Sequence, residues 1–231
     1  MEKNLKLLAF DADDTLWDCQ SQFNEIENLY AGILSPFGTI DEVAASLFKR
    51  ETANMPLLGY GCKAFTISLV ENAITISHGN ISAFDILKIV SLGKSLLTLS
   101  ASPLPEVKET LETIRAQEKY NMVVFTKGEL LDQENKLKRS GLKKYFDDAI
   151  IVSDKSENEY QKLCKRFNVD ISELIMVGNS FKSDIEPVLK LGGKAVHIPY
   201  HTIWKHEVTT EYNHQNLFKI SHFKELIKIL D

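Results

Sequence analysis

Two carboxylates stand two residues apart near the start of the chain, directly after an apolar run. Residues 11–17 read Asp-Ala-Asp-Asp-Thr-Leu-Trp and follow the apolar stretch Leu5–Phe10. Such a stretch is typical of a parallel strand buried on both faces. A calcium-binding loop would require Gly where Leu16 stands, so this run is not a calcium loop. We therefore expect Asp11 and Asp13 to act at the carboxyl end of a buried strand.

Three further polar groups follow predicted strands later in the chain. They are residues 126–128 (Thr-Lys-Gly), residues 153–155 (Ser-Asp-Lys) and residues 178–180 (Gly-Asn-Ser). In open α/β sheets, ligands bind beyond the carboxyl ends of the strands. The sequence therefore predicts one site that gathers side chains from four strand ends.

The elements that carry these groups divide the chain into two parts. From residue 103 onward, apolar strands alternate with helical patterns, which indicates a parallel sheet with crossover helices. Between residues 21 and 99, apolar residues recur at helical spacing, and breaks at 36–38, 56–61 and 78–80 separate about four helices. The predicted fold is α/β, a Rossmann-like parallel sheet (residues 1–17 and 103–231) with an inserted all-helical domain (residues 18–102).

These motifs together resemble those of the haloacid dehalogenase superfamily. Residues 11–15 resemble its first motif, DxDx[TV], and Thr126 resembles the hydroxyl residue of the second. Lys155 resembles the lysine of the third motif, and residues 178–184 resemble the acidic fourth. The resemblance implies a HAD-like core with a type 1 helical cap, in which an aspartate attacks the substrate.

The chemistry of a phosphate ester suits this set of residues. An anionic nucleophile such as Asp11 attacks an anionic ester only if a cation neutralises the charge between them. The resemblance implies Mg²⁺ as that cofactor, held by Asp11, the Asp13 carbonyl and Asp184. The Asp13 side chain is then available to protonate the leaving oxygen and later to deprotonate the attacking water.

Two further positions have competing interpretations. The Thr126 hydroxyl and the Lys127 backbone N–H are expected to bind phosphate, although Thr126 is equally suited to capping a helix. Lys155 is expected to keep Asp11 ionised and to offset charge on the transferred group, with Lys182 as a competitor for this role.

Asn179 departs from the family pattern, in which many members have Asp at the corresponding position. Its neutral oxygen would contact the metal directly or through water. The site thereby loses one negative charge, which predicts weaker Mg²⁺ binding than an Asp would give.

The helical insert occupies the position of the type 1 cap, which closes over the site and contributes substrate contacts in the resembling family. Within it, Tyr60 and Lys63 in the turn 58–63 form a candidate specificity loop. A covered site favours a small phosphorylated metabolite; nucleotides, sugar phosphates and phosphoglycolate all remain open as substrates.

Bulk properties exclude some partners. The net charge of −5 gives no basic face for nucleic acid or anionic lipid. Three scattered cysteines form no CxxC pair, which suits a reducing compartment. The start of the chain does not resemble a signal peptide, and no apolar run is long enough to span a membrane, so we expect a cytoplasmic protein.

Three alternative functions compete with phosphate ester hydrolysis. A 2-haloacid dehalogenase needs neither a metal nor an acid at Asp13 or Asp184, which argues against it. A sugar phosphomutase shares the core motifs, which therefore do not separate it from a phosphatase. A non-catalytic binding protein is suggested only by Asn179.

Overall fold

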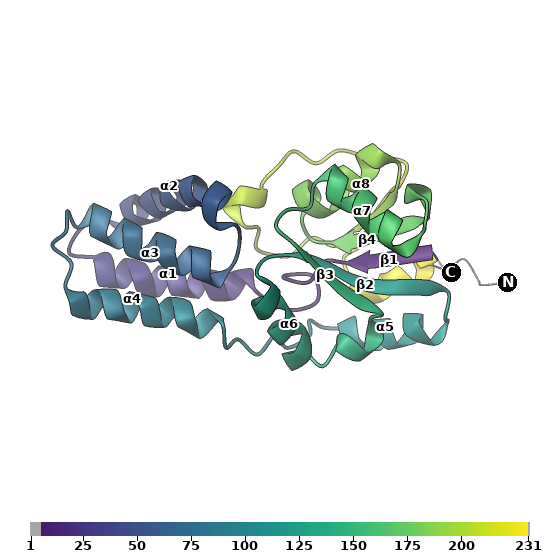
Figure 1. The fold of residues 1–231 in the computed structure, drawn as a ribbon, viewed down its shortest axis with the longest axis horizontal. Helices are drawn as coiled ribbons and strands as arrows, with labels where there is room; N and C mark the ends of the chain where they lie inside the picture. The colour runs from purple at the N-terminus through teal and green to yellow at the C-terminus, as the bar shows by residue number, and fades with distance from the viewer. Residues whose placement is uncertain (1–5, 231) are drawn as a thin grey trace. The chain divides into compact units, whose positions relative to one another are not determined.

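A computed structural model of the chain describes residues 6–230, and Leu5 of the first predicted strand lies outside them. The chain forms two compact units: residues 6–20 with 101–230, called here the core unit, and Ser21–Ser100, called the helical unit (Figure 1). The three apolar clusters respect this division, because two lie wholly within the core unit and one wholly within the helical unit.

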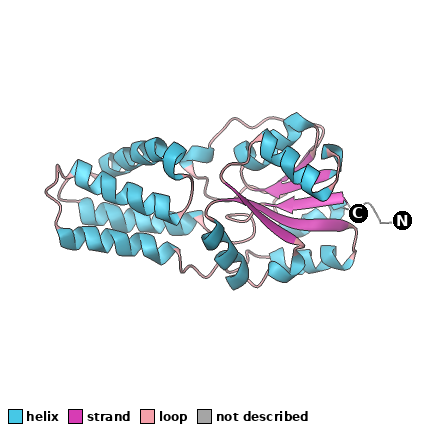
Figure 2. Ribbon diagram, in the orientation of Figure 1, coloured by secondary structure: helices cyan, strands magenta, loops and turns pink. Residues whose placement is uncertain are grey.

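The core unit is built on a six-stranded parallel sheet with helices on both faces (Figure 2). The strand order is β3-β2-β1-β4-β5-β6, with β1 at Lys6–Phe10, β2 at Tyr120–Lys127, β3 at Asp148–Val152, β4 at Leu174–Gly178, β5 at Lys194–His197 and β6 at Leu217–Lys219. The chain moves outward from β1 to β3 and then returns to the other side of β1 at β4. This reversal lies between β1 and β4, and in such sheets ligands bind beyond the carboxyl ends of the strands at the point of reversal.

Alternate side chains of β1 enter two different apolar clusters. Leu8 and Phe10 pack with α5 (Val107–Ala116) and α9 (Leu226–Leu230) on one face. Leu7 and Ala9 pack with α7 (Glu157–Phe167) and α8 (Glu186–Leu191) on the other. Burial on both faces explains why this strand is apolar throughout.

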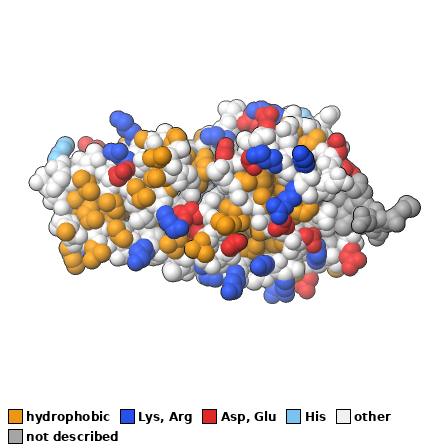
Figure 3. All heavy atoms as spheres, viewed as in Figure 1, with side chains coloured by type: hydrophobic (Ala, Val, Ile, Leu, Met, Phe, Trp, Pro, Cys, Tyr) orange, Lys and Arg blue, Asp and Glu red, His pale blue; other side chains and the backbone are white. Residues whose placement is uncertain are grey.

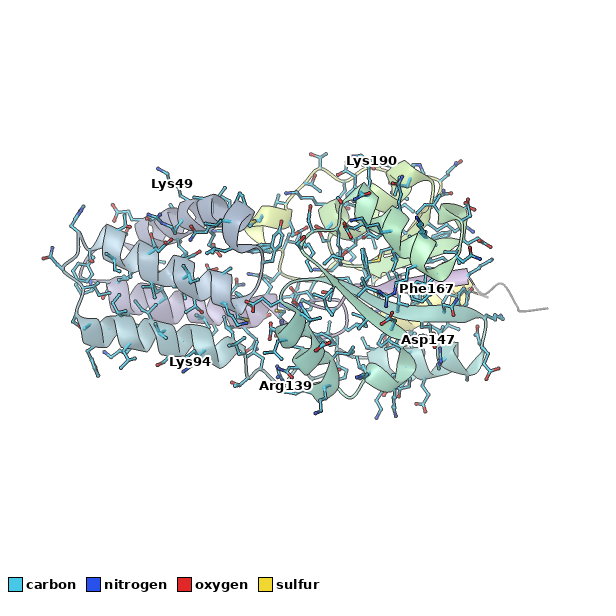
Figure 4. The ribbon with its side chains drawn as sticks, viewed as in Figure 1. Lys49, Lys94, Arg139, Asp147, Phe167 and Lys190 are labelled. Atoms are coloured by element: carbon cyan, nitrogen blue, oxygen red, sulfur yellow. The ribbon has the colours of Figure 1, made fainter. Side chains whose placement is uncertain are left out.

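The predicted α/β fold is confirmed, with local differences. The helix expected to begin at Lys127 is α6 (Leu130–Arg139), which begins three residues later and whose end at Arg139 is labelled in Figure 4. The three-residue β6 was not predicted. Residues 181–185 form a π-helical turn before α8, which the sequence did not predict. Pro56, predicted to begin a break, lies inside α2, which continues to Leu58.

The helical unit contains four helices: α1 (Gln20–Leu34, beginning at the last residue of the core unit), α2 (Ile40–Leu58), α3 (Cys62–Ile76) and α4 (Ala83–Leu96). At its centre the Tyr30 hydroxyl donates to the Leu69 carbonyl at 2.9 Å and accepts from Asn72 Nδ2 at 2.9 Å. Helices α3 and α4 approach closely at Gly93, where an added Cβ would lie 2.0 Å from Thr66 Oγ1. Figure 3 shows hydrophobic side chains gathered over α3 and α4. Phe84 and Leu87 of α4 are exposed.

The two connections between the units leave the core unit side by side. Trp17 and Pro103 form an antiparallel bridge, and the Leu104 N–H donates to the Leu16 carbonyl at 2.9 Å. Among residues 6–230, no helix has the length and apolar character needed to cross a bilayer.

Candidate active site

Three predicted site residues meet around one ammonium group at the carboxyl end of the sheet. Lys155 Nζ, after β3, donates to Asp11 Oδ1 and, at 2.6 Å, to Asp184 Oδ1. Asp11 follows β1, and its N–H donates to the Val177 carbonyl of the neighbouring β4 at 2.9 Å. The strand order thus brings together residues that are up to 173 positions apart in the chain.

The predicted competitor of Lys155 lies elsewhere. Lys182 is exposed, and its Nζ donates to the His206 carbonyl at 2.8 Å. Lys155 is therefore the lysine that contacts Asp11.

This cluster is buried and carries more negative than positive charge. Burial, together with the nearby charge of Asp184, raises the pKa of Asp11 to about 7, although Lys155 opposes the shift. Burial also raises the pKa of Asp184, again against the effect of Lys155. Burial lowers the pKa of Lys155, but the two carboxylates outweigh this effect and the net shift is upward. When the two carboxylates and the ammonium are all ionised, the net charge of the cluster is −1.

The position of Asp184 depends on close packing against Gly178. A Cβ added to Gly178 would lie 2.3 Å from Asp184 Oδ2. The same oxygen accepts from the Ser180 N–H at 3.0 Å. Any larger residue at position 178 would displace this carboxylate.

The Thr15 hydroxyl connects the first and fourth motifs. It lies 3.0 Å from Asp11 Oδ2 and 3.2 Å from Asn179 Oδ1, and it accepts from the Asn179 N–H at 3.1 Å. Asn179 therefore lies beside Asp11, as expected for a residue of the same site.

The Asp13 side chain points to a different set of partners from that of Asp11. It contacts Trp17 from its own turn and Gln133 and Lys136 from α6. Burial alone would raise the pKa of Asp13, but the positive charge of Lys136 and the hydrogen bonds lower it. The two carboxylates of the first motif thus have different environments, with pKa values shifted in opposite directions.

From the sequence alone Asp14 would be expected to be solvated, and this expectation is wrong. Asp14 is buried and adopts a left-handed backbone conformation with φ of 62°. Its Oδ1 accepts from the N–H groups of Cys19 at 2.8 Å and Gln20 at 2.9 Å. Burial raises the pKa of Asp14 to about 7, although these two hydrogen bonds oppose the shift. Its carboxylate therefore fixes the turn that leads out of the first motif.

The second motif ends β2. Thr126 is buried, one position before the end of the strand. The Lys127 amine donates to Glu207 and, at 2.8 Å, to Ser183 Oγ. Glu207 also accepts from Ser180 Oγ and, at 2.7 Å, from Ser183 Oγ, so one carboxylate links the second and fourth motifs.

Tyr60 and Lys63 lie in the helical unit, where α3 begins. Their predicted role in specificity stays a prediction.

Within residues 6–230, no three His, Cys, Asp or Glu side chains form a metal-binding cluster. The expected ligand set contains only two acidic side chains, with a backbone carbonyl and an amide oxygen as the other protein groups.

The sequence did not single out Gln133, Lys136 or Glu207. In the sequence, Gln133 and Lys136 resemble the solvated face of a polar helix, because their spacing of three residues says nothing about burial. Glu207 is 80 positions from Lys127 and has no local motif.

The chain is similar to several known proteins. A glyceraldehyde 3-phosphate phosphatase of Pyrococcus furiosus is 26% identical, with 99% of this chain and 94% of that protein covered. A haloacid dehalogenase-like family hydrolase of Xanthomonas campestris has a similar structure, with a TM-score of 0.88, 30% identity, and coverage of 100% of this chain and 93% of that chain. A 2-haloacid dehalogenase of Pseudomonas syringae shares the fold at a TM-score of 0.64 and 20% identity, with 98% of each chain covered. The family model of haloacid dehalogenase-like hydrolases matches residues 5–192, and this chain therefore belongs to that family.

Proposed function

We propose that this chain is a Mg²⁺-dependent phosphatase that hydrolyses a small phosphorylated metabolite through an aspartyl-phosphate on Asp11. The observation that carries the proposal is the sharing of one Lys155 ammonium by two buried carboxylates, Asp11 and Asp184. The similarity to a glyceraldehyde 3-phosphate phosphatase over almost the whole chain supports a small phosphate ester as the substrate.

The residues fit a magnesium ion. The excess negative charge of the cluster is complementary to a hard divalent cation, and the donors are oxygen atoms, as Mg²⁺ prefers. Asp11, the Asp13 carbonyl and Asp184 would hold the ion, with Asn179 contributing directly or through water. When bound, Mg²⁺ would neutralise charge between the anionic ester and the attacking carboxylate.

The side chains then divide the reaction between them. A carboxylate oxygen of Asp11 attacks phosphorus, the bond to the ester oxygen breaks, and Asp13 gives that oxygen a proton. Lys155 holds Asp11 in place and offsets charge on the transferred group. The Thr126 hydroxyl and the Lys127 backbone N–H bind phosphate oxygens, and Asp13 later takes the proton of the water that hydrolyses the aspartyl-phosphate.

A dehalogenase is the competing reaction, since haloacid dehalogenases share this fold. A departing halide needs no proton, so an acid two residues after the nucleophile would have no role. The presence of both Asp13 and Asp184 in the site favours the phosphatase.

The helical unit is inserted between the first and second motifs, and we propose that it is the cap of this enzyme, with Tyr60 and Lys63 selecting the substrate. Replacing both residues with Ala should change the ratio of kcat/KM between two phosphate esters more than it changes thermal stability. An unchanged ratio would count against this assignment.

The test of the function uses p-nitrophenyl phosphate and a panel of phosphorylated metabolites with Mg²⁺. We expect phosphate release that is abolished by a chelator, restored by added Mg²⁺, and absent in Asp11→Asn. Release of halide from 2-haloacids in the presence of chelator would instead identify a dehalogenase. Isomerisation of a sugar phosphate without phosphate release would identify a mutase.

A further inference from the structure

Both oxygens of the Asp13 carboxylate are held by donors from two parts of the chain. Oδ1 accepts from Trp17 Nε1 at 2.7 Å, and Oδ2 accepts from Gln133 Nε2 at 2.8 Å. Lys136 Nζ lies 3.1 Å from each oxygen. The carboxylate is therefore fixed in position and in rotation.

The Lys136 ammonium is buried at a place where a charge is costly. Only 4% of its side chain is exposed, and its second carboxylate partner, Asp132 at 3.2 Å, is equally buried. Removing an ammonium from water costs several kcal/mol, and an apolar residue often stabilises a protein as well as a buried ion pair does. Packing of α6 against the sheet therefore does not by itself require a lysine here.

Gln133 ties the same carboxylate to the second motif. Its Nε2 donates to the Lys127 carbonyl at 2.9 Å as well as to Asp13. Because both neighbours are acceptors, the amide is oriented with its nitrogen toward them. Helix α6 thus connects Asp13 to the end of β2.

We propose that Lys136, assisted by Gln133, is a positioning residue that holds the Asp13 carboxylate for hydrolysis of the phosphorylated Asp11; this inference rests on the proposed function. In that step a water oxygen attacks phosphorus and its proton passes to Asp13. The bond between phosphorus and the Asp11 oxygen breaks, its electron pair returns to the Asp11 carboxylate, and inorganic phosphate leaves. The step requires a proton acceptor at a fixed place beside the water, and α6 provides that constraint.

The test separates the two half-reactions with p-nitrophenyl phosphate, whose leaving group departs with little help from an acid. For Lys136→Met we expect kcat to fall roughly 10- to 100-fold, part of the contribution typical of a general base. We expect kcat/KM, which reports formation of the aspartyl-phosphate, to fall by less than about threefold. Rapid mixing should show a burst of p-nitrophenol approaching one per enzyme, because the phosphorylated enzyme accumulates.

Two further variants make the experiment decisive. Lys138→Met removes an exposed lysine of the same helix and should leave both kinetic constants unchanged. Gln133→Met removes one hydrogen-bond donor to Asp13 but keeps the Lys136 ammonium beside it. It should show the same burst with a smaller fall in kcat. If Lys136→Met does not fold, as judged by thermal unfolding, Gln133→Met decides the question.

The outcomes distinguish this inference from the proposed function. An active wild-type enzyme whose folded Lys136 or Gln133 variant loses kcat and kcat/KM equally, without a burst, overturns the positioning role alone. An unchanged or increased kcat does the same. A wild-type protein that releases no phosphate from any ester overturns the function and this inference with it.

Discussion

Three neighbouring aspartates, of which Asp11 and Asp14 are buried and Asp13 is partly buried, each have their own partners. Asp11 contacts the ammonium of Lys155, Asp13 contacts that of Lys136, and Asp14 accepts two backbone N–H groups. Because a buried carboxylate is costly without such partners, the partner also defines what the residue does. Within four residues the chain thus places the proposed nucleophile, the proposed proton-transfer group and a residue that fixes a turn.

At the same scale, Asn179→Asp should strengthen Mg²⁺ binding. Asn179 Oδ1 shares the Thr15 hydroxyl with Asp11, so a carboxylate at this position would add a negative charge beside the cluster. We expect the apparent Mg²⁺ dissociation constant to fall roughly tenfold, since cation affinity rises with the number of charged ligands. Titration of activity with Mg²⁺ and calorimetry without substrate both measure this change.

Asn121→Asp is the control for added charge. Asn121 is the second residue of β2, so it lies at the amino end of the strand, whereas the site lies at the carboxyl ends. This control should leave Mg²⁺ affinity unchanged. Equal or weaker affinity in Asn179→Asp would contradict the prediction.

At the scale of elements, two glycines of the helical unit should respond in opposite ways to alanine. Gly93→Ala places a methyl group against Thr66 and should lower the free energy of unfolding by about 2 kcal/mol through overpacking. Gly32→Ala, in α1 with open space around it, should raise it by roughly 0.5 to 1 kcal/mol through helix propensity. Chemical denaturation measures both free energies of unfolding. If Gly93→Ala raised this free energy as Gly32→Ala does, α3 and α4 would not approach as closely as described.

The contacts of Glu207 predict a pH-dependent link between two segments of the core unit. Burial would raise the pKa of Glu207, but the Lys127 charge and the hydrogen bonds hold it below its ordinary value of 4.5. Stabilisation from the ionised form is therefore present above about pH 4.5 and is lost as the pH falls through the folded-state pKa. At pH 7, Glu207→Gln should lower the free energy of unfolding by about 2 kcal/mol, because it removes the charged carboxylate that accepts from Lys127, Ser180 and Ser183.

The check on Glu207 is the difference in Tm between the wild type and Glu207→Gln, measured from pH 7 to pH 3. We expect this difference to shrink below about pH 4.5, where the wild-type carboxyl also becomes neutral. Glu211→Gln, on the same loop but paired with Lys219 at the surface, is the matched control and should have a small effect throughout. A difference for Glu207→Gln that does not change with pH would contradict the prediction.

The sequence predicted those parts of the site that are encoded locally. Asp11 and the fourth motif each follow an apolar strand, and parallel pairing necessarily gathers strand ends at one edge. Lys136 and Glu207 were not predicted, because their partners lie 123 and 80 positions away and buried polar residues have no pattern of their own. The strand β6 has only three residues, too few to show a period of two.

At the scale of the whole molecule, the separation of the apolar clusters predicts that the core unit folds without the helical unit. Replacing residues 21–100 with a short Gly/Ser linker removes one cluster completely and leaves the two that cover the sheet. We expect the shortened protein to keep its sheet and to unfold in one cooperative transition, as measured by circular dichroism. A broad transition without a defined midpoint would contradict this expectation.

The bridge between Trp17 and Pro103 makes this junction a place for exchange of whole domains. Residues paired in an antiparallel bridge lie about 5 Å apart. The core unit therefore fixes the distance between the two points at which an inserted segment is attached. Any helical segment whose two ends lie comparably close can be joined there without altering strand register. Recombination at these two adjacent points of the chain would therefore replace the helical unit as a whole and leave the residues around Lys155 and their hydrogen bonds unchanged.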